Sequence, residues 1–254
     1  MTKRSDGRAL DVLRSVEMQV GFHRPSEGSV LYRAGGTIVL CTASVDESVP
    51  NFRVGSGKGW LTAEYQMHPR ANPKRQDRDG RGRSLGGRTQ EIQRLIGRAL
   101  RAAVNLDKFG ERTITIDCDV LEADGGTRTA SVTGGFVATV LALDTLRKKG
   151  TFATPVLREF VAATSVGLVP GLGTTLDLVY VEDSKADVDL NVVATASGAI
   201  VEVQGTAEGA PVPRATIDGM VDLGLAGVKA LVAEQRKVLV SAGVELAGLF
   251  ETSI

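Results

Sequence analysis

One segment constrains the fold of this chain more than any other. Residues 131–146, with the sequence SVTGGFVATVLALDTL, are apolar almost all the way round when they are placed on a helix. A helix on a protein surface needs a polar side that suits water, and this segment lacks one. It therefore predicts a helix that is buried in the core.

Strand patterns lie on both sides of this helix. Residues 112–123, RTITIDCDVLEA, alternate in polarity, and residues 29–45, SVLYRAGGTIVLCTASV, indicate a hairpin that turns at residues 34–36. Further strands are predicted at 160–169, 174–182, 189–197 and 199–205, with helices at 87–103 and about 215–240. Runs of strands followed by helices, given twice, indicate an α+β architecture with helices packed on sheet faces.

A glycine-rich loop, DGGTRTAS at residues 124–131, joins a predicted strand to the core helix. Glycines let the backbone approach a ligand, and the start of a helix presents N–H groups with a partial positive charge, so the loop suits an anion. Arg128 would supply a full charge. The alternative is an ordinary turn in which Thr129 or Ser131 caps the helix and Arg128 faces water.

A second segment, residues 68–84, has the composition of a mobile arm, because it contains two prolines and few apolar residues. Its basic excess suits the phosphates of a nucleic acid, although a charge run can also be plain solvated surface. Few aromatic residues are available for stacking, so sequence-specific reading of bases is not expected. The basic residues of the arm are Arg70, Lys74, Arg75, Arg78, Arg81 and Arg83, against Asp77 and Asp79.

Acidic residues gather in VEDSKADVDLN, residues 181–191. Mg²⁺ binds through one or two carboxylates together with waters and substrate phosphates, which fits this cluster. Asp187 and Asp189 are two positions apart at the start of a predicted strand and would share one sheet face, to which Asp183 could return over a short turn. The alternative is an acidic hairpin loop without a ligand.

Composition narrows the classes of protein further. Thirty basic residues balance thirty acidic ones, so any affinity for nucleic acid must come from local patches. Cys41 and Cys118 lie in strand-like apolar runs and should be small buried side chains rather than parts of a disulfide or zinc site. The sequence shows no uninterrupted apolar run of membrane-spanning length, so we expect a cytoplasmic protein with no membrane contact.

Two other chemistries fit the sequence poorly. His23 and His68 are the only histidines, and neither lies near a serine or cysteine in a nucleophile motif, which argues against a catalytic triad. VPGLGTTLDL, residues 169–178, superficially resembles the glycine loop of small-molecule kinases of the galactokinase and homoserine kinase type. That loop should open a helix, whereas a β-branched alternation follows here, so we predict a hairpin turn.

Three stretches, in this order and spacing, closely resemble the bacterial ribonuclease PH family. They are GRTQEIQRLIGRALRAAV at 87–104, LEADGGTRTASVTGG at 121–135 and VEDSKADVDLNVV at 181–193. The resemblance covers essentially the whole chain and extends to RSDGRALDVLR at 4–14 and EVQGTAEGAPV at 202–212. It implies one domain over residues 1–254, with the family's duplicated β-α-β fold of mixed sheets and packed helices.

The resemblance also implies an activity. The family consists of phosphate-dependent 3′ to 5′ exoribonucleases that trim the 3′ trailer of precursor tRNA and release nucleoside diphosphates, reversibly as nucleotidyltransferases. Inorganic phosphate would be the co-substrate and Mg²⁺ or Mn²⁺ the cofactor. Precursor tRNA and other RNA 3′ ends would be the partners, and the assembly would be a homohexamer, a trimer of dimers.

Roles carry over residue by residue. Phosphate-binding positions of the family match Arg88, Gly126, Thr127 and Arg128. The acidic pair that positions a divalent ion matches Asp183 and Asp189, and these two with the two arginines would be the catalytic residues. The family grips RNA with the region of the basic arm, here Arg70, Lys74, Arg75 and Arg78, although the register of these residues is not fixed. Asn191 stands where the related polynucleotide phosphorylase has a lysine.

Two other functions stay open at this point. The chain could be a silent ring subunit of exosome type that only binds RNA, but the intact GTRT loop and acidic pair argue against that. It could also be a metabolite kinase that shares the general fold, for which ATP would replace inorganic phosphate.

Overall fold

The computed structural model describes residues 3–82, 84–152 and 154–251. Its first half contains a five-stranded sheet and three helices. In chain order these are β1 (Val16–Val20), β2 (Gly28–Ala34), β3 (Thr37–Asp46), β4 (Trp60–Met67), α1 (Gly87–Ala103), α2 (Leu106–Phe109), β5 (Thr113–Glu122) and α3 (Thr127–Lys148). The spatial order of the strands is β1-β2-β3-β5-β4, and β4 runs parallel to β5 while the other neighbours are antiparallel.

The second half forms an antiparallel sheet of four strands in the order β7-β6-β8-β9. A long helix covers one face of this sheet, and a short 3₁₀ turn follows it. In chain order the elements are β6 (Val161–Val169), β7 (Gly173–Leu176), α4 (Tyr180–Asp183), β8 (Val188–Thr195), β9 (Ile200–Ala207), α5 (Arg214–Ser241) and η1 (Leu246–Gly248).

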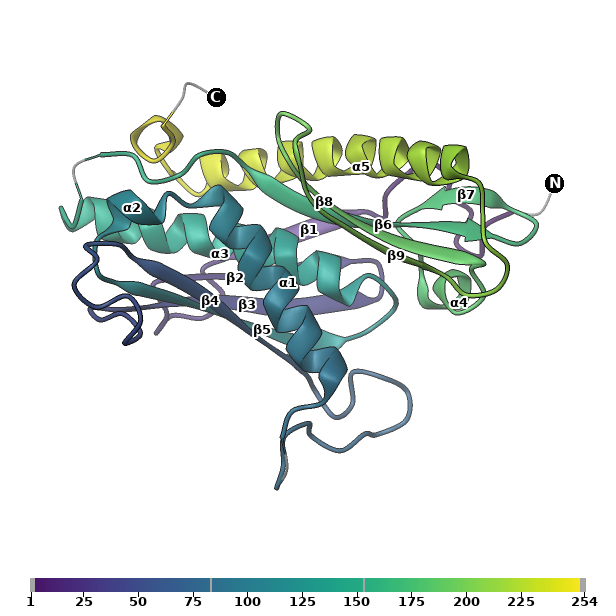
Figure 1. Ribbon diagram of the computed structural model, residues 1–254, viewed down its shortest axis with the longest axis horizontal. Coiled ribbons are helices and arrows are strands. Elements are labelled where there is room, and N and C mark those ends of the chain that lie inside the picture. Colours follow the sequence, from purple (N-terminus) through teal and green to yellow (C-terminus); the bar gives the residue numbers. More distant parts are fainter. Residues whose placement is uncertain (1–2, 83, 153, 252–254) are drawn as a thin grey trace.

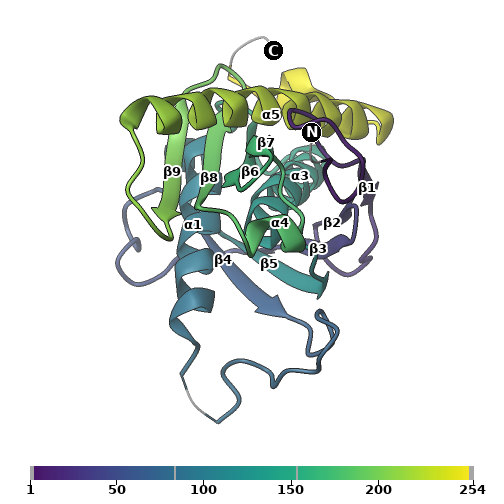
Figure 2. The same ribbon diagram turned by 90° about the vertical axis from the view of Figure 1, so that its right-hand side faces the viewer.

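The elements stack in four layers (Figures 1 and 2). Helices α1 and α3 lie between the two sheets, and α5 lies on the outer face of the second sheet. The distribution of apolar side chains on α1 and α3 explains why these helices lie between the sheets. α1 buries one side, whereas α3 is buried nearly all round and is therefore covered by a sheet on each side.

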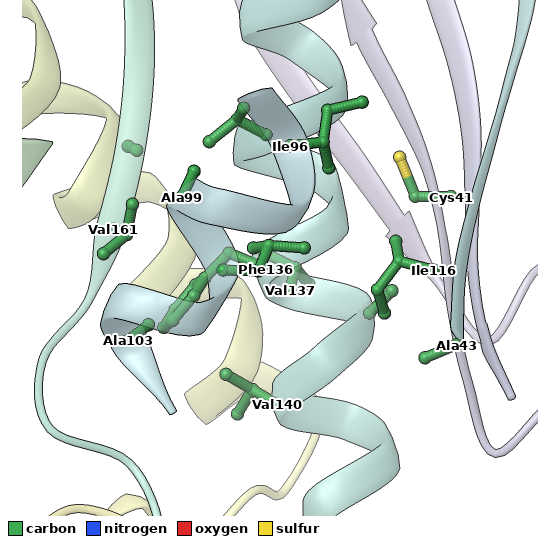
Figure 3. Packing of buried hydrophobic residues seen from close by; sticks show 14 of the residues in the cluster. Cys41, Ala43, Ile96, Ala99, Ala103, Ile116, Phe136, Val137, Val140 and Val161 are labelled. Carbon is green, nitrogen blue, oxygen red and sulfur yellow. The ribbon is translucent and has the colours of Figure 1, made fainter. Parts of the chain in front are cut away.

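The predicted core helix is confirmed as α3. Phe136, Val137 and Val140 point from it into the packed interior, as Figure 3 shows. Its length and composition would also suit a membrane span, but 89% of its most apolar window is buried inside the protein. Gly134 lets α3 approach the first sheet, since a side chain there would meet the Sγ atom of Cys41 at 2.9 Å.

Most of the predicted strands and helices are confirmed. The hairpin of residues 29–45 is β2 and β3, with Ala34 opposite Thr37, and the glycine segment near residue 171 is a hairpin turn between β6 and β7. Cys41 and Cys118 are buried thiols on neighbouring strands. Strands β1 and β4 were not predicted, although WLTAEYQM in β4 does alternate between buried and more exposed positions.

The strand predicted at residues 174–182 is wrong in its second half. β7 ends at Leu176, Asp177 takes a left-handed backbone with φ 53°, and the chain then forms α4. Two distant arginines hold this turn through its side chains. Arg14 donates to the carboxylate of Asp177, and Arg4 pairs with Glu182 in the interior.

Candidate active site

The residues predicted for chemistry line one cavity of about 1060 Å³, which we call the cleft. Both halves of the chain contribute to its wall. The first half supplies the start of α1, the start of α3 and part of the arm, and the second half supplies α4 and β8. All six predicted catalytic and phosphate-binding residues line it, namely Arg88, Gly126, Thr127, Arg128, Asp183 and Asp189.

The glycine-rich loop differs from an ordinary capped turn. Gly126 occupies the N-cap position with φ 66°, and no side chain caps the helix there. Thr129 and Ser131 donate their hydroxyls to the carbonyls of Gly126 and Thr127, so neither satisfies an N–H group of the first turn. The alternative in which these residues cap the helix is therefore wrong, and the first-turn N–H groups stay available to an anion.

Thr127 and Arg128 are both held by neighbours. Thr127 shares a buried hydrogen bond of 2.9 Å with the hydroxyl of Tyr65 on β4. The Nη1 atom of Arg128 donates to Oε1 of Gln204 at 2.8 Å and lies 3.5 Å from Oε1 of Glu91. The side chain of Arg128 is 17% exposed, so it does not simply face water as the alternative required.

Arg88 lies in the first turn of α1 and is exposed at the cleft. Its charge acts on Asp183 in the cleft and on buried Tyr65 behind Thr127, because it opposes the upward shifts in the pKa values of both groups. Arg128 acts on the same two groups. The two arginines therefore create one positive region beside the glycine-rich loop, which suits an oxyanion such as phosphate.

Asp183 ends α4 and Asp189 is the second residue of β8. The pKa of Asp183 is raised above its ordinary value, first because the cleft walls limit its hydration and second because Asp189 is negatively charged. A bound cation would relieve both effects. Asp187 immediately precedes β8, and its backbone N–H and carbonyl bond to Leu168 and Glu208 on the two sides. Its predicted place on the face of Asp189 stays a prediction, but its side chain is exposed and does not line the cleft.

The acidic pair fits a hard divalent cation. Its donors are carboxylate oxygens, which Mg²⁺ and Mn²⁺ prefer, and two of them leave room for waters and substrate phosphates. In the described residues, no group of three or more His, Cys, Asp or Glu side chains is arranged around a common point for a metal. The protein would thus complete such a site only together with its substrate.

Buried arginines near the N-terminus support the cleft, and the sequence patterns did not reveal this. Arg14 donates to the carbonyl of Asp124 at 2.7 Å and to the carboxylate of Asp177 at 2.6 Å, which joins the glycine-rich loop to the second half. Arg4 pairs with Glu182 at 2.8 Å, next to Asp183. Both arginines belong to the segment RSDGRALDVLR, which carries part of the resemblance to the family. Nothing in that segment indicates that their partners lie more than 160 residues away.

The arm is an irregular segment that projects past the start of α1 (Figures 1 and 2). Its beginning is tied to the sheet, since the N–H of His68 donates to Val120 and the carbonyl of Ala71 accepts from Ala123. Arg70 and Lys74 line the cleft. Arg75 and Arg78 do not, and Arg75 lies 3.4 Å from Asp77. Arg83 lies outside the described residues.

Asn191 is buried in the wall of the cleft, on the same face of β8 as Asp189. Across the sheet it lies between Ser165 of β6 and Gln204 of β9. The sheet is therefore polar on the side of the cleft, whereas Leu190 and Val192 on the other side belong to an apolar cluster with Met220 of α5.

The sequence matches the models of both domains of the 3′ exoribonuclease family. The first domain matches residues 12–143 and the second matches residues 159–227. The single domain expected over residues 1–254 stays a prediction.

Two curated relatives illustrate the similarity. Ribonuclease PH of Bacillus subtilis is 52% identical over 236 residues, which are 93% of this chain and 96% of the relative. Ribonuclease PH of Rhodococcus erythropolis is 54% identical over 240 residues, which are 94% of this chain and 92% of the relative.

Solved structures share the fold at much lower identity. Rice (Oryza sativa) Rrp46 aligns with a TM-score of 0.75 and 16% identity over 93% of this chain and 100% of that chain. A chain of the Archaeoglobus fulgidus exosome with RNA bound to the active site aligns with a TM-score of 0.75 and 21% identity, over 91% and 92%. These two likenesses concern the fold, and the matches to the domain models and the curated relatives establish the family: the chain belongs to the ribonuclease PH family of 3′ exoribonucleases.

Proposed function

We propose that this chain is a phosphorolytic 3′ to 5′ exoribonuclease that trims the 3′ trailer of precursor tRNA and releases nucleoside 5′-diphosphates. One observation carries the proposal: two arginines, a glycine-rich helix start and a pair of aspartates from both halves of the chain line the same cleft. The first set suits a free phosphate, and the second suits a cation that shares the phosphates of a substrate.

The arrangement performs phosphoryl transfer by positioning and by neutralising charge. Arg88, Arg128 and the N–H groups that follow Gly126 hold orthophosphate, an oxygen of which attacks the terminal phosphodiester in line. A P–O bond forms to the attacking oxygen, and the bond to the 3′ oxygen of the preceding nucleotide breaks. That oxygen leaves and takes up a proton, so the RNA ends in a 3′ hydroxyl. The reverse reaction adds a nucleotide from a nucleoside diphosphate.

Asp183 and Asp189 would hold Mg²⁺ or Mn²⁺ in this scheme. A cation bound there supplies neutralisation of the charge on the scissile phosphate. The chain's own contribution is to bring two carboxylates to one cleft, with the buried pair of Arg4 and Glu182 tying α4 to the N-terminal segment.

Assembly is part of the proposal. The Archaeoglobus fulgidus chain that shares the fold comes from an exosome by its title, and we infer that this chain forms a homohexamer. Exposed apolar side chains on the edge strand β9, such as Ile200 and Val203, support an interface on this chain. Light scattering after gel filtration should give the mass of six 26.7 kDa chains.

The deciding experiment incubates the purified protein with a precursor tRNA that carries a short labelled trailer, with and without inorganic phosphate. Nucleoside diphosphates should appear only when phosphate is present. Nucleoside monophosphates without phosphate would mean hydrolysis and would contradict the proposal. Binding of the tRNA without any product would favour the silent ring subunit.

A further inference from the structure

Gln204 contacts both charged groups that meet at the edge of the cleft. Its side-chain oxygen accepts a hydrogen bond from Nη1 of Arg128 at 2.8 Å, and its nitrogen donates to Oε1 of Glu91 at 3.0 Å. Glu91 belongs to α1, Arg128 to α3 and Gln204 to β9, so the three side chains join the two halves of the protein. We propose that Gln204 is a positioning residue. It orients the guanidinium of Arg128 and keeps Glu91 from neutralising the charge of Arg128, so that Arg128 can bind phosphate.

These hydrogen bonds leave one edge of Arg128 open. Among the described residues, Nη1 is the only nitrogen of its guanidinium that makes a hydrogen bond. Nε and Nη2 form the opposite edge, and these two parallel donors match two oxygens of a phosphate. Fixing Nη1 from outside the cleft therefore presents the edge that binds an oxyanion in two places.

The chemistry of an amide suits this position. A direct ion pair between arginine and carboxylate has a donor–acceptor distance of about 2.7 to 2.9 Å. Here Nη1 of Arg128 is 3.5 Å from Glu91, while Gln204 lies closer to both partners. The neutral amide of Gln204 thus donates a hydrogen bond to the carboxylate of Glu91. Glu91 then neutralises less of the positive charge of Arg128, and more of that charge acts on an incoming anion.

The chain offers a matched control in the same two elements. Glu202 lies two residues before Gln204 on β9 and pairs with Arg98 of α1 at 2.7 Å. This second bridge also joins β9 to α1, but neither of its residues lines the cleft. A substitution of Glu202 therefore shows how phosphorolysis changes when a contact between β9 and α1 is lost outside the cleft.

The test measures phosphorolysis over a range of phosphate concentrations, and it rests on the proposed role of Arg128. Q204L removes both hydrogen bonds and should raise KM for phosphate about tenfold, the value for one charged hydrogen bond. At saturating phosphate, kcat of Q204L should stay within about twofold of the wild-type value, because bound phosphate itself orients the guanidinium of Arg128. KM for RNA should not move, and E202L should leave both KM values unchanged.

Q204E separates positioning from packing, because it keeps the shape of the side chain and adds a charge. A second carboxylate beside Glu91 would repel phosphate and engage Arg128, so KM for phosphate should rise at least as far as in Q204L. Wild-type KM in a folded Q204E protein would overturn the inference. So would an equal rise in E202L.

A double variant distinguishes this inference from the proposed function. If Gln204 acts through Arg128, adding Q204L to R128A should change KM for phosphate no further. An R128A protein with normal phosphate affinity would refute the role of Arg128 itself. A strong effect of R128A together with none of Q204L would refute only the role of Gln204.

Discussion

The guanidinium of Arg14 lies 2.6 Å from the carboxylate of Asp177, although the two residues are 163 positions apart in the sequence. Both side chains are nearly buried, with 6% and 10% of their surface exposed. The same arginine also donates to the carbonyl of Asp124 in the glycine-rich loop. One buried ion pair therefore links the phosphate side of the cleft to the segment that carries the acidic pair.

Asp177→Asn should lower the free energy of unfolding at pH 7 by about 3 kcal/mol, because Arg14 would stay buried without a counter-charge. Urea unfolding measures the change. Asp218→Asn serves as control, since Asp218 pairs with Arg214 on the surface and such pairs contribute about 1 kcal/mol or less. Equal losses in the two variants would contradict the structural role of Asp177.

The same variant should show a defined pH dependence. Burial alone would raise the pKa of Asp177, but hydrogen bonds and the charge of Arg14 outweigh burial and lower it below its ordinary value of 3.8. A lowered pKa in the folded state stabilises the protein above the ordinary value and loses that effect as pH falls below it. The stability difference between wild type and Asp177→Asn should accordingly shrink below about pH 4.

Gly125→Ala should impair the cleft more than its backbone strain explains. Gly125 has φ +76°, and a side chain there would lie 2.5 Å from the carbonyl of Leu178. The loop would then have to move away from the second half. Gly173→Ala is the matched control, because Gly173 has φ +90° and open space around it. Both variants should lose about 1 kcal/mol of stability from strain, but only Gly125→Ala should also lose phosphorolysis.

The sequence predicted those parts of the fold that local patterns determine. Apolar side chains all round α3 and alternation in β5 are properties of short windows, and both elements form as expected. Residues 177–182 were also predicted as strand, but Asp177 starts a turn that leads into α4, and the arginines of the N-terminal segment bind its side chains. Such a tertiary interaction leaves no local trace, so pattern reasoning fails there.

The candidate site follows the same rule: residues in short motifs could be predicted, and contacts between distant elements could not. The glycine-rich loop and the acidic pair are short motifs and could be located in the sequence. Glu91 lies within a recognised motif, yet its hydrogen bond with Gln204 spans 113 residues and depends on β9 reaching the side of α1. Likewise, only the fold shows that Lys74 faces the cleft and Arg75 does not.

Arg88→Ala and Arg128→Ala should each reduce kcat/KM for phosphate about 100-fold, because each removes a charged donor to the attacking group. Binding of RNA, measured by filter retention, should remain nearly intact. Arg94→Ala is the control for the first variant, since Arg94 is exposed on α1 and does not line the cleft. An equal loss of RNA affinity would mean that these arginines bind RNA rather than phosphate.

Asp183→Asn and Asp189→Asn should reduce turnover severely at every phosphate concentration, because they weaken the site for a divalent cation. Binding of Mn²⁺, followed by electron paramagnetic resonance, should weaken in parallel. Asp187→Asn is the control between them in the sequence, as its side chain lies outside the cleft. Recovery of turnover at saturating phosphate would remove the two aspartates from the metal site.

Replacing Arg75 and Arg78 with alanine should weaken tRNA binding without changing saturated turnover. Neither residue lines the cleft, so each should act only through RNA phosphates outside it. The slope of log affinity against log salt should fall by about one unit for each RNA phosphate that the protein no longer neutralises. Arg214→Ala, at an exposed arginine at the start of α5, should have no effect.

The particle mass must be measured on the same Arg75 and Arg78 variant. A weakened tRNA affinity in an intact hexamer supports an RNA clamp. Dissociation into dimers would instead make the arm an element of assembly, and the RNA assignment would be wrong.

The long sequence separation between Arg14 and Asp177 also means that the ion pair cannot form until late in the synthesis of the chain. At about 5 to 20 residues per second, a ribosome needs roughly 10 to 30 s to extend the chain by the 163 positions from Arg14 to Asp177. Only in the last part of that interval does the emerging chain carry the glycine-rich loop, and it then still lacks the aspartates that complete the cleft. The two walls of the cleft can therefore meet only after the ribosome has added the chain through Asp189.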